Sequence, residues 1–235
     1  METELKPNAG KNGIIEVDGI RYLRLPIATH LITKNDDICD VAEKYGKPLL
    51  QEGDVLFISE KIVACTQNRA IPLEDIQPRK LAYTLSRYVT RTPHGIGLGM
   101  PETMEYALRE CGTLRILFAA VCSVIGKKIF KKKGWFYAVA GYKARSIDGP
   151  CHNTIPPYNK YVVLGPVKPD KVAREISQRI GFRTAIVDIN DLEGQVLGVS
   201  QKSMDKGLYA RILRDNPLGQ DDQQTPMGII RVVNE

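Results

Sequence analysis

Two short, nearly continuous apolar runs, at residues 54–59 and 184–187, constrain the fold of this chain more than any other feature. Runs of this length and composition are typical of buried β-strands. The second run ends directly before Asp188, so the sequence places an acidic side chain at the carboxyl end of a buried strand. Together with the helical segments elsewhere in the chain, the two runs predict a mixed α/β (α+β) fold.

The remaining elements are predicted from hydrophobic spacing and from the residues at segment ends. We expect further strands at residues 13–17, 20–25, 135–140, 161–164, 195–199 and 227–233, the first two joined at Asp18-Gly19. Helices are expected at residues 35–45, 78–91, 101–111, 169–180 and 203–214. Residues 60–65 are expected to extend the buried strand, residues 115–124 fit either a buried helix or a buried strand, and residues 141–159 are expected to be irregular. No linker is evident, so we expect a single domain over residues 1–235, either undivided or in two lobes.

Several classes of protein are disfavoured. No apolar run approaches the ~18–20 residues that a membrane helix needs, and the polar N-terminus has no apolar signal core. The five cysteines include no pair separated by only two residues, so a zinc ribbon, a redox pair and a disulfide framework all lack support. We therefore expect a cytoplasmic protein with reduced thiols and no membrane partner.

The formal net charge is +6, from 33 Lys and Arg residues against 27 Asp and Glu residues, and a basic excess attracts anions. Much of the excess lies in one stretch that contains Lys127, Lys128, Lys131, Lys132 and Lys133. This stretch fits a solvated helix end or loop, and it also fits a contact with polyphosphate or nucleic acid. Aromatic residues do not alternate with the lysines as a stacking platform requires, so nucleic acid is not the expected partner.

Acidic and amide side chains gather at three places where a divalent cation could bind. Asp188 is followed by Asn190 and Asp191, whose oxygen atoms suit Mg²⁺ or Mn²⁺, although the same residues also fit a capped turn. Asp148 lies in a loop rich in Gly and Pro, where it fits either an Asp-Gly turn or a functional site, and Asn153 nearby could contact a phosphate or a base. Residues 216–226 form either a solvated connection or a loop that places Gln220 or Asp221 on a metal.

The usual sequence motifs for nucleotide binding are absent. The glycine loop at residues 95–99 has the wrong spacing for a dinucleotide fingerprint, and no Gly-x-x-x-x-Gly-Lys-Ser/Thr pattern exists. No serine lies in a nucleophile elbow. A nucleotide site in this chain would therefore be of an unusual kind.

Four segments, in the same order, resemble the coenzyme F-420 gamma-glutamyl ligase family over most of the chain. Residues 52–63 are similar to the family's early strand, where polar residues meet the nucleotide. Residues 140–148 resemble its Gly-Ile-Asp metal loop, and residues 187–190 resemble its Thr-Asp-Thr-Asn metal motif. Residues 218–226 resemble the terminal Gly-Gln loop that closes the metal site.

The resemblance implies a GTP-dependent ligase, with ATP as the other possible nucleotide, on an intertwined homodimeric fold. Such an enzyme phosphorylates a substrate carboxylate, and the amino group of an amino acid such as glutamate then displaces the phosphate to form an amide. Mg²⁺ or Mn²⁺ would bridge the nucleotide phosphates. By the same resemblance the metal ligands are Asp148, Asp188 and Gln220, and the nucleotide contacts are Glu60, Lys61, Asn153, Gly219 and Asp221.

Two departures from the family pattern keep a second hypothesis open. Ile189 stands beside Asp188 where the family has threonine, and Cys65 stands where a lysine commonly follows the early strand. Both changes favour a non-catalytic protein that binds a nucleotide or metabolite on the same scaffold. They also mean that the acceptor need not be the deazaflavin coenzyme.

Overall fold

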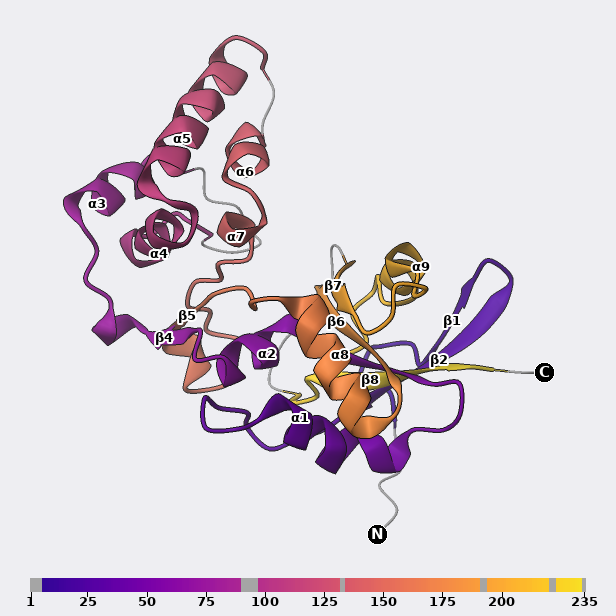
Figure 1. Cartoon of the computed structure of the whole chain (residues 1–235). Coiled ribbons are helices and arrows are strands. Elements are labelled where there is room, and N and C mark those ends of the chain that lie inside the picture. Colours follow the sequence, from indigo (N-terminus) through magenta and orange to yellow (C-terminus); the bar gives the residue numbers. More distant parts are fainter. Residues whose placement is uncertain (1–5, 90–96, 132–133, 191–193, 220–222, 234–235) are drawn as a thin grey trace. The chain divides into compact units, whose positions relative to one another are not determined.

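The computed structural model describes residues 6–89, 97–131, 134–190, 194–219 and 223–233 (Figure 1). The chain divides into two compact units, unit 1 from Met1–Asn68 with Pro166–Glu235, and unit 2 from Arg69–Gly165. In unit 1 the Gln67 side chain exchanges hydrogen bonds of 3.0 and 2.7 Å with the backbone of Val167. In unit 2 the backbone N–H of Leu164 donates to the carbonyl of Arg69 at 2.9 Å. Unit 2 is therefore an insertion into unit 1 whose two ends lie side by side.

Unit 1 is built on a six-stranded sheet with the order β1-β2-β8-β3-β6-β7. Neighbouring strands run antiparallel except for β3 and β6, which are parallel. The expected hairpin is confirmed, and its turn has positive φ at both Asp18 and Gly19, as a two-residue hairpin turn requires. The strands are β1 (Ile14–Val17), β2 (Ile20–Ile27), β3 (Val55–Ser59), β6 (Arg183–Ile189), β7 (Gly194–Val199) and β8 (Met227–Val232).

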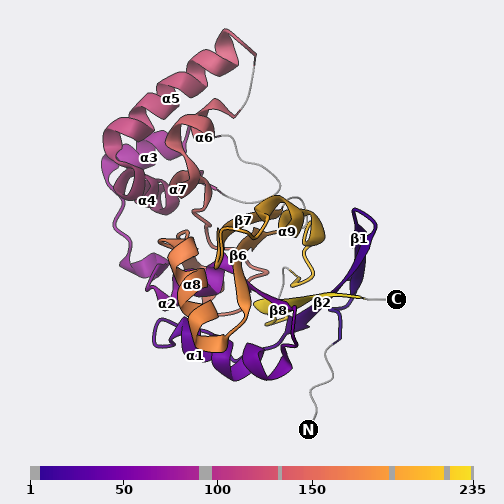
Figure 2. The ribbon, with the colours of Figure 1, turned by 45° about the vertical axis from the view of Figure 1, so that its right-hand side comes forward.

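Helices cover both faces of this sheet, which explains why its central strands are almost wholly apolar. One face, with Leu56, Ile58 and Ile186, packs against α1 (Ile38–Val41), α2 (Glu60–Thr66) and α8 (Pro169–Ile180). The other face, with Phe57 and Val187, packs against α9 (Lys206–Ile212) (Figure 2). A π-helical turn (Ala42–Gly46) and a 3₁₀ turn (Lys47–Leu49) follow α1. The mixed α/β class is confirmed.

Two local predictions are wrong. Residues 60–65, expected to extend strand β3, form helix α2 because the Ser59 side chain accepts a hydrogen bond from the Lys61 N–H and caps a new helix. Residues 135–140, expected to be a strand, form helix α6 (Trp135–Ala140), which begins after Gly134 in the left-handed region. The aromatic and β-branched residues of α6 favour a strand locally, but packing against α5 decides the outcome.

Unit 2 is mainly helical. Its core contains Leu98, Met104, Leu108, Ile116 and Val162. The segment at residues 115–124, which fitted either structure, lies within a helix, and the expected irregular segment contains the short helix α7. The elements are β4 (Ala70–Pro72), a 3₁₀ turn (Leu73–Asp75), α3 (Lys80–Ser86), α4 (Pro101–Cys111), α5 (Thr113–Lys128), α6, α7 (Tyr142–Arg145), a 3₁₀ turn (Tyr158–Lys160) and β5 (Tyr161–Val163). None of the described helices is both long and apolar enough to cross a lipid bilayer.

An ion pair between a buried arginine and a partly exposed aspartate anchors the segment that leads toward the last strand. Arg24 on β2 is fully buried and pairs with the carboxylate of Asp215. Its guanidinium also donates to the carbonyl of Ile212 at 3.0 Å and to that of Asn12 at 2.5 Å. Burial works to raise the pKa of Asp215, but the hydrogen bond and charge of Arg24 outweigh it and hold the pKa below its usual value.

Candidate functional site

The carboxyl ends of β3 and β6 meet at one edge of the unit 1 sheet. In their parallel register Ser59 lies opposite Val187. The next residues, Glu60 at the start of α2 and Asp188 near the end of β6, therefore lie at neighbouring positions. A ligand that bound between the ends of these strands would meet both, as ligands do at the carboxyl edge of open α/β sheets.

The segments beside β8 and β2 end at the same edge. The Ser59 N–H donates to the carbonyl of Pro226 at 2.9 Å, which places the residues before β8 against the end of β3. Just beyond β2, the Thr29 N–H donates to the carbonyl of Gln224 at 3.1 Å, and the Gln224 side chain donates back to the Thr29 carbonyl at 3.0 Å. Four segments of the chain thus converge on this edge, and all belong to unit 1.

The loop that begins at Gly219 is closed at its base. The Asn8 side chain donates to the Leu218 carbonyl at 2.9 Å and to the Thr225 hydroxyl at 2.8 Å, and that hydroxyl donates to the same carbonyl. Gly219 has φ of +78°, and its carbonyl accepts from the Asn216 side chain at 2.9 Å. These contacts hold both arms of the loop at the sheet edge. Gln220 and Asp221 lie outside the described residues.

The predicted site residues of unit 1 differ in exposure. Glu60 is buried at the first turn of α2, whereas Lys61 beside it is exposed. Asp188 is half-buried. Along β6 Ile186 packs on the face that carries α8, while Val187 and Ile189 pack on the opposite face. Because side chains alternate along a strand, Asp188 shares its face with Ile186, and Ile189 is turned away from it.

The predicted site residues of unit 2 lie near strand β5. Asp148 forms an isolated β-bridge with Val163, with hydrogen bonds of 2.8 and 2.9 Å, and its side chain is half-buried. Asn153 is exposed in a turn closed by the hydrogen bond from the Thr154 N–H to the Cys151 carbonyl. Asp148 and Asp188 thus belong to different units, and their convergence with Gln220 on one ion stays a prediction.

The donors at the unit 1 edge suit a hard cation. Asp188 contributes a carboxylate and Asn190 an amide oxygen, the oxygen types that Mg²⁺ and Mn²⁺ take in proteins. Among the described residues no three His, Cys, Asp or Glu side chains gather at one ion position. A cation held here would therefore complete its coordination with water, amide oxygens or substrate phosphates, which is usual for Mg²⁺.

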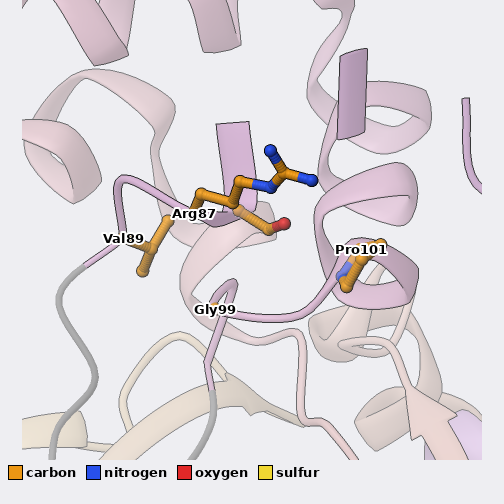
Figure 3. Close-up of a pocket in the computed structure, with 5 residues that line it drawn as sticks. Arg87, Val89, Gly99 and Pro101 are labelled. Atoms are coloured by element: carbon orange, nitrogen blue, oxygen red, sulfur yellow. The ribbon is translucent and has the colours of Figure 1, made fainter. Parts of the chain in front are cut away.

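A separate hollow of about 490 Å³ lies within unit 2. It is lined by Ser86, Arg87, Val89, Gly99 and Pro101. Figure 3 shows the Arg87 side chain extending toward the helix that begins at Pro101. None of the predicted site residues lines this hollow, and we place the candidate site at the sheet edge because Glu60, Lys61 and Asp188 follow the paired Ser59 and Val187 there.

Sequence reasoning missed the contribution of the segment after β2. Thr29 reaches the edge through Gln224, and the next residue, His30, bonds through its two ring nitrogens to Tyr45 and Asp36, each at 2.8 Å. Burial works to raise the pKa of Asp36, but hydrogen bonds from His30 and Thr33 outweigh it and lower that pKa. No local motif predicts that this segment lies at the sheet edge, because its position depends on β8 lying between β2 and β3.

Comparison with known proteins agrees with the motifs found in the sequence. The sequence model of a family described as F420-0:gamma-glutamyl ligase matches residues 26–231. A coenzyme F420:L-glutamate ligase of Methanopyrus kandleri is 25% identical over 234 residues, covering 85% of this chain and 82% of the relative. The match includes β3, β6 and the loop before β8, and it confirms the resemblance inferred from the four segments.

Proposed function

The chain belongs to the F420-0:gamma-glutamyl ligase family, and we propose that it is a nucleotide- and metal-dependent ligase. In this proposal it joins an amino acid such as glutamate to a carboxylate acceptor. GTP or ATP activates the acceptor as an acyl phosphate. The observation that carries the proposal is the Ser59–Val187 register, which brings Glu60, Lys61 and Asp188 to one sheet edge.

The proposed reaction has two steps. An oxygen of the acceptor carboxylate attacks the γ-phosphorus, the bond to the bridging oxygen breaks, and the nucleoside diphosphate leaves. The amino nitrogen of the amino acid then attacks the acyl carbon, the bond to the phosphate oxygen breaks, and inorganic phosphate leaves. The amine loses its proton to solvent or to the departing phosphate. A divalent cation would neutralise charge on the phosphates in the first step.

The residues at the edge suit these steps. The half-buried Asp188 would hold the cation, and the exposed Lys61 at the first turn of α2 would offset the charge of a phosphate. The backbone of Gly219, whose loop is closed at its base, would approach the nucleotide. Asp148, Gln220, Asn153 and Asp221 enter the proposal through the family resemblance. A homodimer is part of the same proposal.

The test is a coupled measurement of phosphate release and of product mass. The protein is incubated with GTP or ATP, Mg²⁺ or Mn²⁺, glutamate and a deazaflavin acceptor, and each component is omitted in turn. We expect phosphate release and a mass increase of one glutamyl residue only in the complete mixture. Asp188→Asn should lower turnover about 100-fold, because a cation contributes several kcal/mol to such a step.

The control is Glu175→Gln, which alters an exposed acid of α8 that pairs with Lys171 and should leave turnover unchanged. Full turnover by Asp188→Asn would contradict the proposed metal site. Stabilisation of the fold by nucleotide and Mn²⁺, with phosphate release at background for every amine, would instead support the non-catalytic binding protein.

A further inference from the structure

Helix α5 of unit 2 turns its large apolar side chains outward. Leu114 is 83% exposed, Phe118 62% and Ile129, just beyond the helix, 68%. The spacing of these residues follows the three- and four-residue repeat of one helix face. The exposed apolar row, as we call this surface, consists of Leu114, Leu117, Phe118, Val121, Val124, Ile125 and Ile129.

The opposite side of α5 already supplies the contacts that unit 2 needs. Ile116 and Ala119 are fully buried in the core of the unit. Gly126 meets the ring of Trp135 so closely that a Cβ atom there would lie 2.8 Å from it. In Figure 1 helix α6 lies along one side of α5 within this unit. The exposed apolar row is therefore not needed to hold α5 in place.

The charged residues in and around α5 are all basic. Between Cys111 and Ile147 the sequence contains eight Lys and Arg residues and no Asp or Glu. This segment therefore carries a formal charge of +8, while the rest of the chain carries −2. Lys128 and Lys131 are exposed beside the end of the row, and Lys132 and Lys133 follow in the sequence.

An aromatic pair marks the same end of the row. The rings of Phe130 and Trp135 are stacked with their centroids 5.2 Å apart, and Phe130 is itself exposed. An outward apolar helix face, flanking lysines and an aromatic pair at its end is the pattern of helices that lie in the plane of a membrane surface. Each of these features suits one layer of a bilayer. Apolar side chains pack at the boundary with the acyl chains, and lysines pair with anionic headgroups.

We propose that α5 docks unit 2 onto an anionic lipid bilayer. The exposed apolar row lies at the boundary between headgroups and acyl chains, and Lys128 and Lys131 contact the headgroups. The helix lies on the membrane and does not span it, since its 16 residues extend only about 24 Å. The expectation of no membrane partner rested on the lack of a spanning run, which surface docking does not require.

Charge selects a bilayer over a second copy of this chain. A symmetric dimer through this face would bring together two segments that each carry a formal charge of +8 and contain no Asp or Glu to offset it, which opposes the association. An anionic surface instead attracts them. Nucleic acid would attract the lysines too, but it gives no role to an apolar row that occupies the length of a helix.

The test is flotation of the full chain with vesicles. We expect binding to phosphatidylcholine vesicles that contain about 30% phosphatidylserine, weak binding to pure phosphatidylcholine, and weakening as salt is raised. The single tryptophan, Trp135, reports directly, because its emission should shift to shorter wavelength when vesicles are added. Lys128→Glu with Lys131→Glu should lower vesicle affinity about tenfold or more, whereas Lys202→Glu in unit 1 should change it little.

Apolar contact is tested separately by Phe118→Ser, with Tyr88→Ser as the matched control because Tyr88 is 79% exposed elsewhere in unit 2. We expect about a tenfold loss of affinity from the first and little from the second, with circular dichroism unchanged in both. Lack of vesicle binding by the unaltered chain would overturn the proposal. So would a dimer that Phe118→Ser dissociates in solution, or binding to DNA or RNA that Phe118→Ser leaves unchanged.

Discussion

Ser59 of β3 and Val187 of β6 lie opposite one another in a parallel strand pair, and this register brings Glu60 and Asp188 to the same sheet edge. Glu60 and Asp188 are separated in sequence by more than half of the chain. Their proximity depends on β3 and β6 being neighbours, and on both strands running in the same direction. The edge is therefore a property of the topology and not of either motif alone.

Lys61 is expected to contribute to nucleotide affinity and not to stability. Its side chain is exposed at the first turn of α2, so Lys61→Met should leave the free energy of unfolding nearly unchanged. If it offsets phosphate charge, the KM for GTP or ATP should rise about tenfold. Titration of phosphate release against nucleotide measures this, with Lys202→Met as the control. An unchanged KM would remove Lys61 from the site.

Ile189 should matter for packing and not for turnover. It packs on the face of β6 opposite to Asp188, against the cluster that contains Val187. Ile189→Thr should therefore lower the free energy of unfolding by about 1–2 kcal/mol while changing turnover less than about twofold. Val232→Thr, at an exposed position of β8, should cost less than about 0.5 kcal/mol. A large gain in turnover with Ile189→Thr would show that this position limits catalysis.

The Arg24–Asp215 pair should make stability depend on pH. Because the pKa of Asp215 is lowered in the folded chain, its contribution is fully present above the unfolded pKa of about 3.9. It is lost as the pH falls through the lower folded pKa. Asp215→Asn should cost about 2 kcal/mol at pH 7, less than a fully buried pair because the Asp215 side chain is 39% exposed.

Urea unfolding of the unaltered chain and of Asp215→Asn at a series of pH values measures this contribution. We expect the difference between the two chains to shrink as the pH approaches 3. The exposed pair Lys171–Glu175 provides the control, since Glu175→Gln should cost less than about 0.5 kcal/mol at every pH. A difference that stays constant down to pH 3 would contradict the assignment to Asp215.

Gly198 on β7 should tolerate no side chain. A Cβ atom there would lie 2.3 Å from the carbonyl carbon of Pro169, at the start of α8, so helix and strand would have to separate. Gly198→Ala should lower the free energy of unfolding by about 3 kcal/mol, measured by urea unfolding. Gly207→Ala in α9 should not lower it, because the built Cβ atom lies 3.2 Å from its nearest neighbour, the Asp205 carboxylate, and alanine is favoured over glycine in a helix. Equal effects of the two changes would refute the close contact.

Sequence reasoning succeeded where a local pattern and its tertiary setting agree. Helices α4 and α8 begin at Pro101 and Pro169, as proline at a helix start predicts, and α8 ends before Gly181. The buried strands β3 and β6 were predicted from their apolar runs, because both faces of this sheet are covered. The residues at the ends of these elements, or their apolar runs, define them locally, so the sequence is sufficient to predict them.

The predictions failed where contacts with other parts of the chain determine the local structure. The Ser59 cap ends β3, and the apolar residues 62–65, which would otherwise extend the strand, form part of α2. Packing against α5 makes Trp135–Ala140 helical despite its aromatic and β-branched content. The role of Thr29 at the edge depends on strand order, which no local pattern records. The outward apolar face of α5 was also missed, since a buried helix and an exposed apolar helix have the same composition.

The adjacency of Arg69 and Leu164, with that of Gln67 and Val167, has a consequence for how such a protein can change over time. A segment whose two ends touch can be lengthened, shortened or exchanged without altering the register of the sheet that hosts it. Changes of length within unit 2 can therefore be accommodated without moving Ser59 relative to Val187.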